Sequence, residues 1–464
     1  MKKTTFAAAN QKYIVLMKKF LWISAATLIV SSPTFAGDYL TNTNQHAAFL
    51  RMVARGASIS TDAVYSNPAG LSFLPEDGFY LSLTGQSAYQ TREIAATTPL
   101  WTMDGNNTTR QYKGTASAPI IPSFHGAYKK GDWTISAGFA ITGGGGKASF
   151  SNGLPMFDAL TVGGIASNKD LAAAFGGKPV TPDMYTINTA MDGKQYIYGV
   201  QLGLSYKIND WLSVYAGGRM NYVQSGYEGY LKATLHEQFG GKQLMNLELD
   251  CEQSGWGITP IIGVDVKLDK WNFGAKYEFI SNLNIENTTH KLEAPGVPED
   301  VIKPYADGEQ TPSDIPAFLS VAAQYEILPT LRASVEYHFF DDKHAGMLND
   351  RQKTLKRGTH EYLAGIEWDV IKRLTISGGF QKTSYGLSDD FQTDTSFYCS
   401  SYSLGFGARV NLSESLNMDI AYFWTNYDDY TKSENNYYGI LPMSGSNTYS
   451  RTNKVFGLSL NYHF

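Results

Sequence analysis

The chain has no long apolar run, no linker and no low-complexity tract. Beyond the first 36 residues, no stretch approaches the roughly 20 apolar residues that a membrane-spanning helix needs. A soluble secreted chain of this length usually divides into domains joined by linkers. The sequence therefore favours neither a helical membrane protein nor a multidomain soluble one.

Motifs of catalysis and of cofactor binding are also missing. The tetraglycine Gly143–Gly146 precedes Lys147, but a phosphate-binding loop would need glycine at Ile141 and a hydroxyl residue at Ala148. No nucleophile elbow and no H-E-x-x-H zinc motif occurs, and the histidines are scattered singly. We therefore expect no enzyme, no metal site and no cofactor.

The N-terminus has the pattern of an export signal. Lys18 and Lys19 precede an apolar run, Phe20–Val30, and small residues lead to a cut after Ala36. Removing residues 1–36 takes away five lysines and no acidic residue, so the net charge falls from −5 to −10. This acidic balance argues against a nucleic-acid partner.

Cysteine is scarce, with Cys251 and Cys399 the two in the chain. Export to an oxidising compartment permits a disulfide between them. They belong to predicted strands that are far apart, so a bridge needs a loop that folds inward. The alternative is two free thiols.

Glycine and aromatic residues are plentiful instead. An exported chain with 45 glycines, 30 tyrosines and 24 phenylalanines, and without apolar helices, is typical of an outer-membrane β-barrel. From Gly78 onward the residues alternate with the strand period of two. Short polar turns interrupt this alternation at Lys129–Asp132, Lys207–Asp210, Leu268–Lys270, Ile327–Thr330, Val370–Arg373 and Asn411–Ser415. Long loops fall between them at 96–110, 151–194, 235–253, 290–312, 342–357, 385–396 and 431–450. The predicted fold class is all-β, a 14-stranded antiparallel transmembrane barrel of residues 78–464.

The two faces of the predicted strands have the polarity of a barrel in lipid. In one strand Val335 and Tyr337 lie on one side, and Glu336 and His338 on the other. Charges on the inner face are costly in a dry core and stable in a hydrated lumen. Aromatic residues flank the short turns, as an interfacial girdle requires. They are Trp133, Trp211, Trp271, Trp368 and Tyr206.

The last predicted strand alternates apolar and polar residues up to Phe464. This pattern resembles the C-terminal signal read by the outer-membrane assembly machinery. We therefore expect that machinery as a partner through Phe464, and an outer-membrane location.

The local sequence predicts a turn at Asp62–Leu71, D-A-V-Y-S-N-P-A-G-L, because Pro68 fixes its own φ and has no N–H. Between an export signal and a barrel it resembles the hatch of the FadL-type family of long-chain fatty acid and hydrocarbon transporters. The triplet Asn67, Pro68 and Ala69 is the most specific mark, and the likeness runs the length of the mature chain.

This resemblance implies that residues 37–77 form a hatch inside the barrel. It also implies that a hydrophobic substrate lodges between outer loops and moves into an apolar pocket above the hatch. The substrate then leaves sideways into the membrane, through a gap in the third strand, without nucleotide or metal.

The tetraglycine is the predicted lateral opening, because glycines have no side chains to pack and favour a bulge. The predicted opening comprises Thr142, Gly143, Gly144, Gly145 and Gly146. The alternative is a glycine-rich loop outside the membrane. In the loop 151–194, apolar residues either pack on one another or form a groove for substrate. They are Leu154, Met156, Phe157, Leu160, Leu171 and Phe175.

The carboxylate of a fatty acid would require a cation. Arg219 points inward by strand parity, and Lys356 and Arg357 precede a later strand. None of them matches the family's carboxylate-binding residues without ambiguity, which leaves a neutral hydrocarbon open as substrate. The alternative role for Arg219 is a salt bridge in the lumen.

The sequence therefore predicts passive uptake of hydrophobic molecules, long-chain fatty acids first, with outer-membrane lipid as a further partner. A hydrocarbon-selective transporter, an aqueous diffusion pore and a surface receptor are the alternatives. A hatch in the lumen argues against the open pore.

Overall fold

The computed structural model describes residues 43–104, 108–295, 297 and 299–464. The predicted signal peptide, 1–36, lies outside them. Within the described ranges, no helix is long and apolar enough to cross a membrane.

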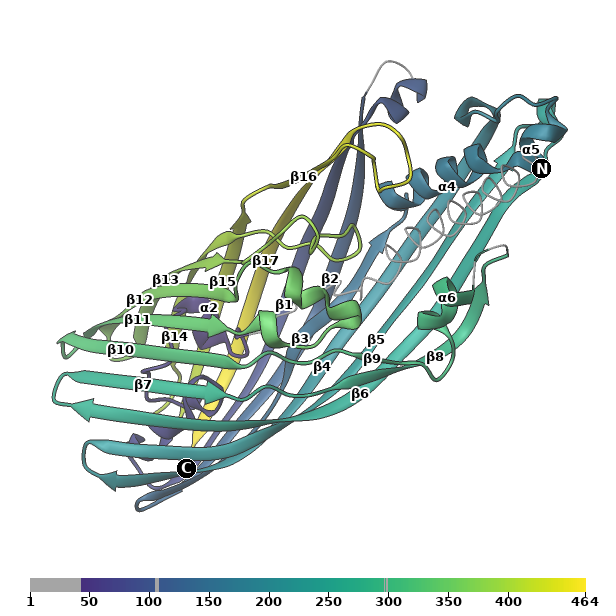
Figure 1. Cartoon of the computed structure of the whole chain (residues 1–464). Coiled ribbons are helices and arrows are strands. Elements are labelled where there is room, and N and C mark those ends of the chain that lie inside the picture. The colour runs from purple at the N-terminus through teal and green to yellow at the C-terminus, as the bar shows by residue number, and fades with distance from the viewer. Residues whose placement is uncertain (1–42, 105–107, 296, 298) are drawn as a thin grey trace.

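A single antiparallel sheet closes on itself, because β1 pairs with both β2 and β17 (Figure 1). The described strand segments are β1 (Gly78–Thr97), β2 (Thr109–Lys130), β3 (Trp133–Phe150), β4 (Tyr185–Asn209), β5 (Leu212–Leu235), β6 (Gln243–Leu268), β7 (Trp271–Glu278), β8 (Asn284–Glu293), β9 (Gln310–Pro312), β10 (Phe318–Leu328), β11 (Leu331–Phe340), β12 (Thr359–Ile371), β13 (Leu374–Ser384), β14 (Ser401–Asn411), β15 (Leu416–Tyr427), β16 (Tyr430–Glu434) and β17 (Gly445–His463). Three of them, β8, β9 and β16, prolong β7, β10 and β15, so the wall has the predicted fourteen strands.

The helices are short. The described α-helices are α2 (Ala47–Arg51), α3 (Ala63–Ser66), α4 (Pro155–Ser167), α5 (Lys169–Ala174) and α6 (Glu299–Ile302). The described 3₁₀ helices are η1 (Pro68–Phe73), η2 (Pro99–Asp104), η3 (Pro182–Met184), η4 (Glu237–Phe239), η5 (Lys303–Tyr305), η6 (Asp342–His344) and η7 (Leu348–Thr354).

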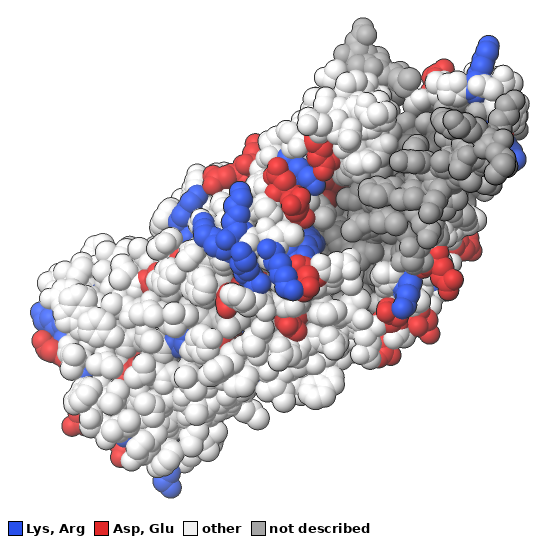
Figure 2. Space-filling view, viewed as in Figure 1, with Lys and Arg blue, Asp and Glu red and all other residues white. Residues whose placement is uncertain are grey.

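All six short turns fall where the sequence predicts them, at the end of the barrel that is at the lower left of Figure 1. The outward face near this end is apolar. Figure 2 shows a broad surface there with few charged side chains, which fits a wall embedded in hydrocarbon. The tryptophans predicted for the girdle are all on the outside, with Trp133 51% exposed and Trp368 48% exposed.

The loops at the opposite end are shorter than predicted, because several strands continue far beyond the apolar band. The prediction placed loops at 151–194 and 235–253, whereas β4 already begins at Tyr185 and β6 at Gln243. The cause is a change of polarity along one face. The inward side of β5 carries Arg219 and Asn221 at membrane depth, but Leu231 and Leu235 above it. These upper apolar side chains build a core for the outer loops, where the membrane no longer provides apolar surroundings.

Both cysteines are free thiols that are buried in this outer core. The hydroxyl of Thr289 contacts Cys251 Sγ at 3.5 Å, and Cys399 Sγ donates to the carbonyl oxygen of Tyr449 at 3.5 Å. The disulfide that the sequence permits does not form.

The N-terminal segment 43–77 is called the hatch from here on, and its residues 43–74 lie inside the barrel. Helix α2 packs on β14, β15 and β17, and η1 packs on β4, β5 and β6. Apolar contacts of Leu50 and Val53 with Ala421 and Val455 fill part of the space. The barrel therefore has a packed lower lumen.

Ion pairs fix the hatch to the wall. Arg51 Nη1 lies 2.6 Å from Glu367 Oε1, and Arg51 Nε lies 2.8 Å from Asp419 Oδ1. Arg55 pairs with Asp62 inside the hatch at 2.8 Å and reaches Glu367 at 3.4 Å. All five side chains are buried, so each charge depends on its partners, because an uncompensated charge away from water is costly.

The Asn67-Pro68-Ala69 corner is also held at each residue. Asn67 Nδ2 donates to Asp265 Oδ2 at 2.9 Å. The carbonyl oxygen of Pro68 accepts a hydrogen bond from Ser205 Oγ at 2.7 Å, and that of Ala69 accepts one from Ser213 Oγ. Because Pro68 fixes its own φ and the wall bonds the Asn67 side-chain NH₂ and the carbonyl oxygens of Pro68 and Ala69, this corner holds the hatch rigidly.

Replacing Arg51 with methionine should release the hatch. Asp419 and Glu367 would each lose a cation, and breaking a buried pair in this way costs ~3–5 kcal/mol. Hydrogen exchange of backbone amides in residues 47–73 should then accelerate by ~100-fold or more, while the barrel stays folded by heat-modifiable gel mobility.

The control is Lys113→Met, which removes an exposed pair with Glu93 on the outside of β1 and β2. An exposed pair contributes less than ~1 kcal/mol, so exchange in the hatch should not change. Equal exchange in the Arg51 variant and the wild type would show that the ion pairs do not hold the hatch.

Candidate functional site

The wall is interrupted between β2 and β3. Ser117 pairs with Lys147 and Phe124 pairs with Phe139, but no ladder pair joins 118–123 of β2 to 140–146 of β3. A second stretch of the described wall also lacks ladder pairs, at 255–260 of β6 opposite 279–285, where β7 is followed by β8. The interruption between β2 and β3, called the wall gap, lies at the predicted tetraglycine, which is part of β3 and not a loop.

Local sequence explains the gap on both edges. On β2, Pro119 and Pro122 lack the N–H groups that a ladder needs. On β3, Gly144 and Gly145 have φ values of +66° and +118°, which favour glycine. Two register shifts on the other side of β3 bend the strand further, between Ile141 and Gly143 and between Gly144 and Gly146. The two prolines are a signal that sequence reasoning missed.

A hatch residue bridges the two edges of the gap. Gln45 Nε2 donates to the carbonyl oxygen of Ile141 on β3 at 3.0 Å, and Ser123 Oγ on β2 donates to the carbonyl oxygen of Gln45. Gln45 is 3% exposed. Backbone polar groups at membrane depth need partners inside the protein, and Gln45 provides one for the interrupted wall.

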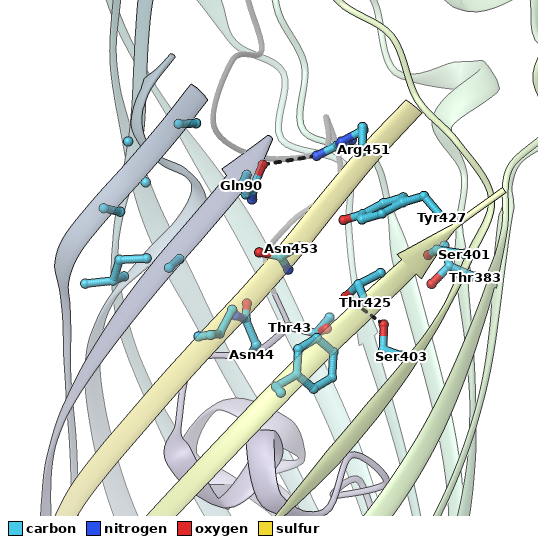
Figure 3. Close-up of a pocket in the computed structure, with 18 of the residues that line it drawn as sticks. Thr43, Asn44, Gln90, Thr383, Ser401, Ser403, Thr425, Tyr427, Arg451 and Asn453 are labelled. Carbon is cyan, nitrogen blue, oxygen red and sulfur yellow. Dashed lines mark hydrogen bonds between the residues drawn. The ribbon is translucent and has the colours of Figure 1, made fainter. Parts of the chain in front are cut away.

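A cavity lies above the hatch and extends to the wall gap (Figure 3). Thr43, Asn44 and Phe49 of the hatch form its floor. On the gap side it is lined by Ala116, Ser117, Ala118, Ile121, Gly144, Gly145 and Gly146. The opposite side is lined by Glu361, Gln381, Thr383, Ser401, Ser403, Phe423, Thr425, Tyr427, Arg451, Asn453 and Val455.

This cavity is more polar than the apolar pocket that the resemblance implies. Hydroxyl and amide side chains dominate the wall opposite the gap, and Ser403 Oγ and Thr425 Oγ1 lie 2.9 Å apart. The cation that lines it is Arg451 of β17, which donates to Gln90 Oε1 at 3.3 Å and lies 4.9 Å from the ring centre of Tyr427. Strand parity places Arg451 inward, so its position could have been considered from sequence.

The structure does not bring the three predicted cations together. Arg219 lies at the depth of the hatch, where it pairs with Glu278 at 2.7 Å and lies 4.9 Å from the ring centre of Tyr65. This is the lumen salt bridge that the sequence left open. Lys356 and Arg357 are exposed at the outer rim, and Arg357 Nη2 donates to Ser384 Oγ at 2.7 Å.

The predicted loop residues mostly pack on one another. Leu154, Met156, Phe157 and Leu160 are buried in the outer core, with Leu171 and Phe175 partly buried against it. A buried carboxylate fixes the start of α4. Asp394 accepts hydrogen bonds from the Met156 N–H and Tyr449 Oη, each at 2.9 Å, and burial raises the pKa of this carboxyl group.

A second, almost wholly apolar hollow lies beside Phe157, and it is called the outer groove. It is formed by the extended ends of β4, β5, β6 and β8, and by the segment around α6. Its main lining side chains are Met191, Tyr227, Leu231, Leu247, Leu249, Leu292, Val297, Ile302 and Tyr305. Sequence reasoning did not foresee the contribution of β8 to this groove.

Hydrogen bonds connect the cavity wall to the hatch. Glu361, which lines the cavity, contacts His338 Nδ1 at 2.9 Å. His338 Nε2 contacts Glu336 Oε1 at 2.7 Å, and Glu336 Oε2 accepts from the N–H of Gly56 in the hatch at 2.8 Å. The position of the hatch therefore depends on side chains that an occupant of the cavity can reach.

The described residues hold no cluster of three or more His, Cys, Asp or Glu side chains that could bind a metal ion. What the geometry offers is a plugged barrel, a cavity above the plug and a gap in the wall beside it. A closed antiparallel barrel of fourteen strands with an apolar exterior is an outer-membrane β-barrel.

No family model matches the chain, and no curated protein matches it by sequence. Solved structures do resemble it. A FadL homologue of Pseudomonas aeruginosa has a TM-score of 0.64 at 16% identity, over 92% of this chain and 100% of that one. The toluene transporter TodX of Pseudomonas putida has a TM-score of 0.52 at 13% identity, over 89% and 97%. The toluene transporter TbuX of Ralstonia pickettii has a TM-score of 0.50 at 15% identity, over 89% and 99%. At these identities the likeness establishes the fold, and the fold is that of FadL-type barrels.

Replacing Gln45 with alanine should loosen the seal of the wall gap. A cysteine introduced at Ala118 would then react several-fold faster with a maleimide that partitions into the bilayer, because the hydrogen bond from the Gln45 side chain to the carbonyl oxygen of Ile141 is gone. Both native thiols are buried, which keeps background labelling low.

A cysteine at Ile120 serves as the reference, since this side chain is 75% exposed on the lipid side. Its labelling should be the same with and without Gln45. Unchanged labelling at position 118 would mean that Gln45 does not close the gap.

Proposed function

We propose that this protein takes up hydrophobic molecules across the outer membrane and delivers them sideways into the lipid through the wall gap. The observation that supports the proposal most directly is the cavity above the hatch, which extends to the interruption between β2 and β3. An interrupted ladder at membrane depth costs free energy, because backbone N–H and C=O groups lose their partners. A path for substrate from the cavity to the lipid would explain why the barrel keeps such an interruption.

The path begins in the outer groove. Its apolar lining binds a hydrocarbon chain by removing it from water, at about 25 cal/mol per Å² of buried apolar surface. From there the molecule moves to the cavity above the hatch. No nucleotide takes part, so the direction of transport follows the concentration gradient of the substrate.

Opening requires that the upper end of the hatch move. Residues 44 and 45 are held by neutral hydrogen bonds, such as the one from Asn44 Nδ2 to Gln86 Oε1 at 3.3 Å. Such bonds each contribute ~1 kcal/mol, far less than the buried ion pairs of Arg51. An occupant of the cavity therefore displaces Gln45 and opens the gap while the lower hatch stays seated.

Long-chain fatty acids remain the favoured substrates. The cation nearest to a bound carboxylate would be Arg451, which lines the cavity. The three cations predicted from sequence, Arg219, Lys356 and Arg357, do not line it. The toluene transporters among the similar structures keep neutral hydrocarbons as the alternative. Thr142 and the tetraglycine form the exit, and the Asn67-Pro68-Ala69 corner keeps the lumen closed to straight passage.

Ile121→Trp should block the exit. Ile121 lines the cavity on the edge of the gap, and its Cδ1 would lie 3.5 Å from a side chain at Gly145. An indole there fills the opening. Uptake of labelled oleate by cells that lack their own transporter should fall at least tenfold relative to the wild-type protein.

Ile120→Trp is the matched control, because the neighbouring side chain faces lipid and should leave uptake unchanged. Uptake that persists in the Ile121 variant would contradict a lateral exit. Large steady currents of the wild-type barrel in planar bilayers would instead favour an aqueous pore. Absence of oleate uptake by the wild-type protein as well as by both variants would favour a receptor.

A further inference from the structure

Two of the cations predicted from sequence, Lys356 and Arg357, lie outside the cavity and have no part in the proposed uptake. They end the loop that precedes β12, beside the outer end of β13, and both side chains are exposed. Their position at the outer rim of the wall indicates a ligand that comes from outside the barrel.

The guanidinium group of Arg357 is held in one orientation. Its Nη1 donates to the carbonyl oxygens of Gly358 and Ser384, each at 3.1 Å, and its Nη2 donates to Ser384 Oγ at 2.7 Å. The backbone is fixed as well, because the N–H of Lys356 donates to the carbonyl oxygen of Gly386 at 2.8 Å, and a side chain at Gly386 would collide with Arg357. A guanidinium group carries five N–H donors, so Arg357 still has donors for a ligand.

A second cation lies next to this group on the outer face of β13. Lys382 is two residues before Ser384 on the same strand, so the two side chains point the same way about 7 Å apart. Lys382 Nζ lies 3.1 Å from Asp428 Oδ2, and both side chains of this pair are exposed. Such a pair contributes less than ~1 kcal/mol, so it leaves Lys382 able to bind another anion.

Exposed aromatic rings lie beside and below the two cations. Phe380, two residues before Lys382 on β13, is exposed on the same face. Tyr362 of β12 and Tyr402 of β14 are the register partners of Lys382, and the ring centres of Tyr402 and Phe380 are 6.3 Å apart. Aromatic side chains gather at the headgroup level of a membrane, so Arg357 and Lys382 lie at that level.

The charge of the surface changes at the same level. Figure 2 shows Lys and Arg side chains gathered where the band with few charges gives way to the outer loops. An arginine binds phosphate through parallel N–H bonds, and a lysine adds a point charge. A free phosphate ion would use the cations alone, whereas a lipid would also place its acyl chains on the aromatic rings below them. The combination favours a lipid.

We propose that Arg357 and Lys382 bind the phosphate group of a lipid of the outer leaflet, whose acyl chains lie along Phe380 and Tyr362. Lys356, adjacent in the chain, adds to the positive charge of this site. The site is on the outside of β12 and β13, apart from the wall gap between β2 and β3. It therefore goes beyond the proposed uptake function and does not depend on it.

The test is lipid binding to the purified, detergent-solubilised full-length barrel, measured by native mass spectrometry. The probes are diphosphoryl lipid A and the same lipid without its phosphate groups. Replacing both Arg357 and Lys382 with glutamine should weaken binding of the diphosphoryl form ~10–30-fold, because each cation contributes about 1 kcal/mol toward an anionic headgroup. Binding of the dephosphorylated form should stay within twofold.

The matched control replaces Lys113 and Lys147 with glutamine, since these are two exposed cations on the outside of β2 and β3. It removes the same charge and should leave both affinities unchanged. Lys382→Gln alone gives an independent variant, with severalfold weaker binding of the diphosphoryl form expected, and heat-modifiable mobility shows that each barrel is folded.

Three results would overturn the proposal. One is equal binding of diphosphoryl lipid A by the wild type and the double variant. Another is an equal loss in the control, which would show a general effect of charge. The third is displacement of the lipid by an equal concentration of inorganic phosphate, which would show a site for a free anion.

Discussion

A backbone group in hydrocarbon has no water to bond, so every strand of a membrane barrel must pair with its neighbours. The interruption between 118–123 of β2 and 140–146 of β3 leaves backbone without ladder pairs, and the upper end of the hatch and the cavity lie beside it. Gln45 spans its edges, and the cavity lies directly above. Buried ion pairs of Arg51 and Arg55 keep the hatch that carries Gln45 in place.

Two kinds of attachment divide the hatch into parts with different strength. Its lower part is fixed by ion pairs and by the rigid corner at Asn67, Pro68 and Ala69, which Ser205 and Ser213 hold. Its upper end is attached by neutral hydrogen bonds. A molecule in the cavity competes with the second set and not with the first. In the proposed uptake, the upper end of the hatch moves and opens the wall gap, while the lower part still prevents free diffusion along the barrel axis.

Much of the fold could be predicted because period-two alternation and polar turns are local signals. All six short turns and the number of strands are confirmed. The lengths of the strands were not predictable in this way. Above the membrane the inward face of β5 becomes apolar at Leu231 and Leu235, so the polarity that marks a strand in lipid no longer applies.

The site was predictable only in part. The tetraglycine indicated the edge of the gap on β3. The other edge, at Pro119 and Pro122, follows from the pairing of β2 with β3, which no local sequence pattern reveals. Arg219 faces inward as expected, yet whether it meets a ligand or Glu278 is decided by tertiary structure. The polar cavity, with Arg451, Asn453 and Gln381 from two separate strands, arises from closure of the barrel.

The route of exit is the central claim, and photo-crosslinking tests it most directly. A twelve-carbon acid with a diazirine at its tail would be bound to the barrel in lipid bilayers, irradiated and located by mass spectrometry of the labelled peptides. The account predicts adducts in 116–121 of β2 and 143–146 of β3, together with adducts around Asn453. Adducts that continue past the hatch along the inner face near Ser213 and Tyr215, with none at the gap, would show an axial route and contradict it.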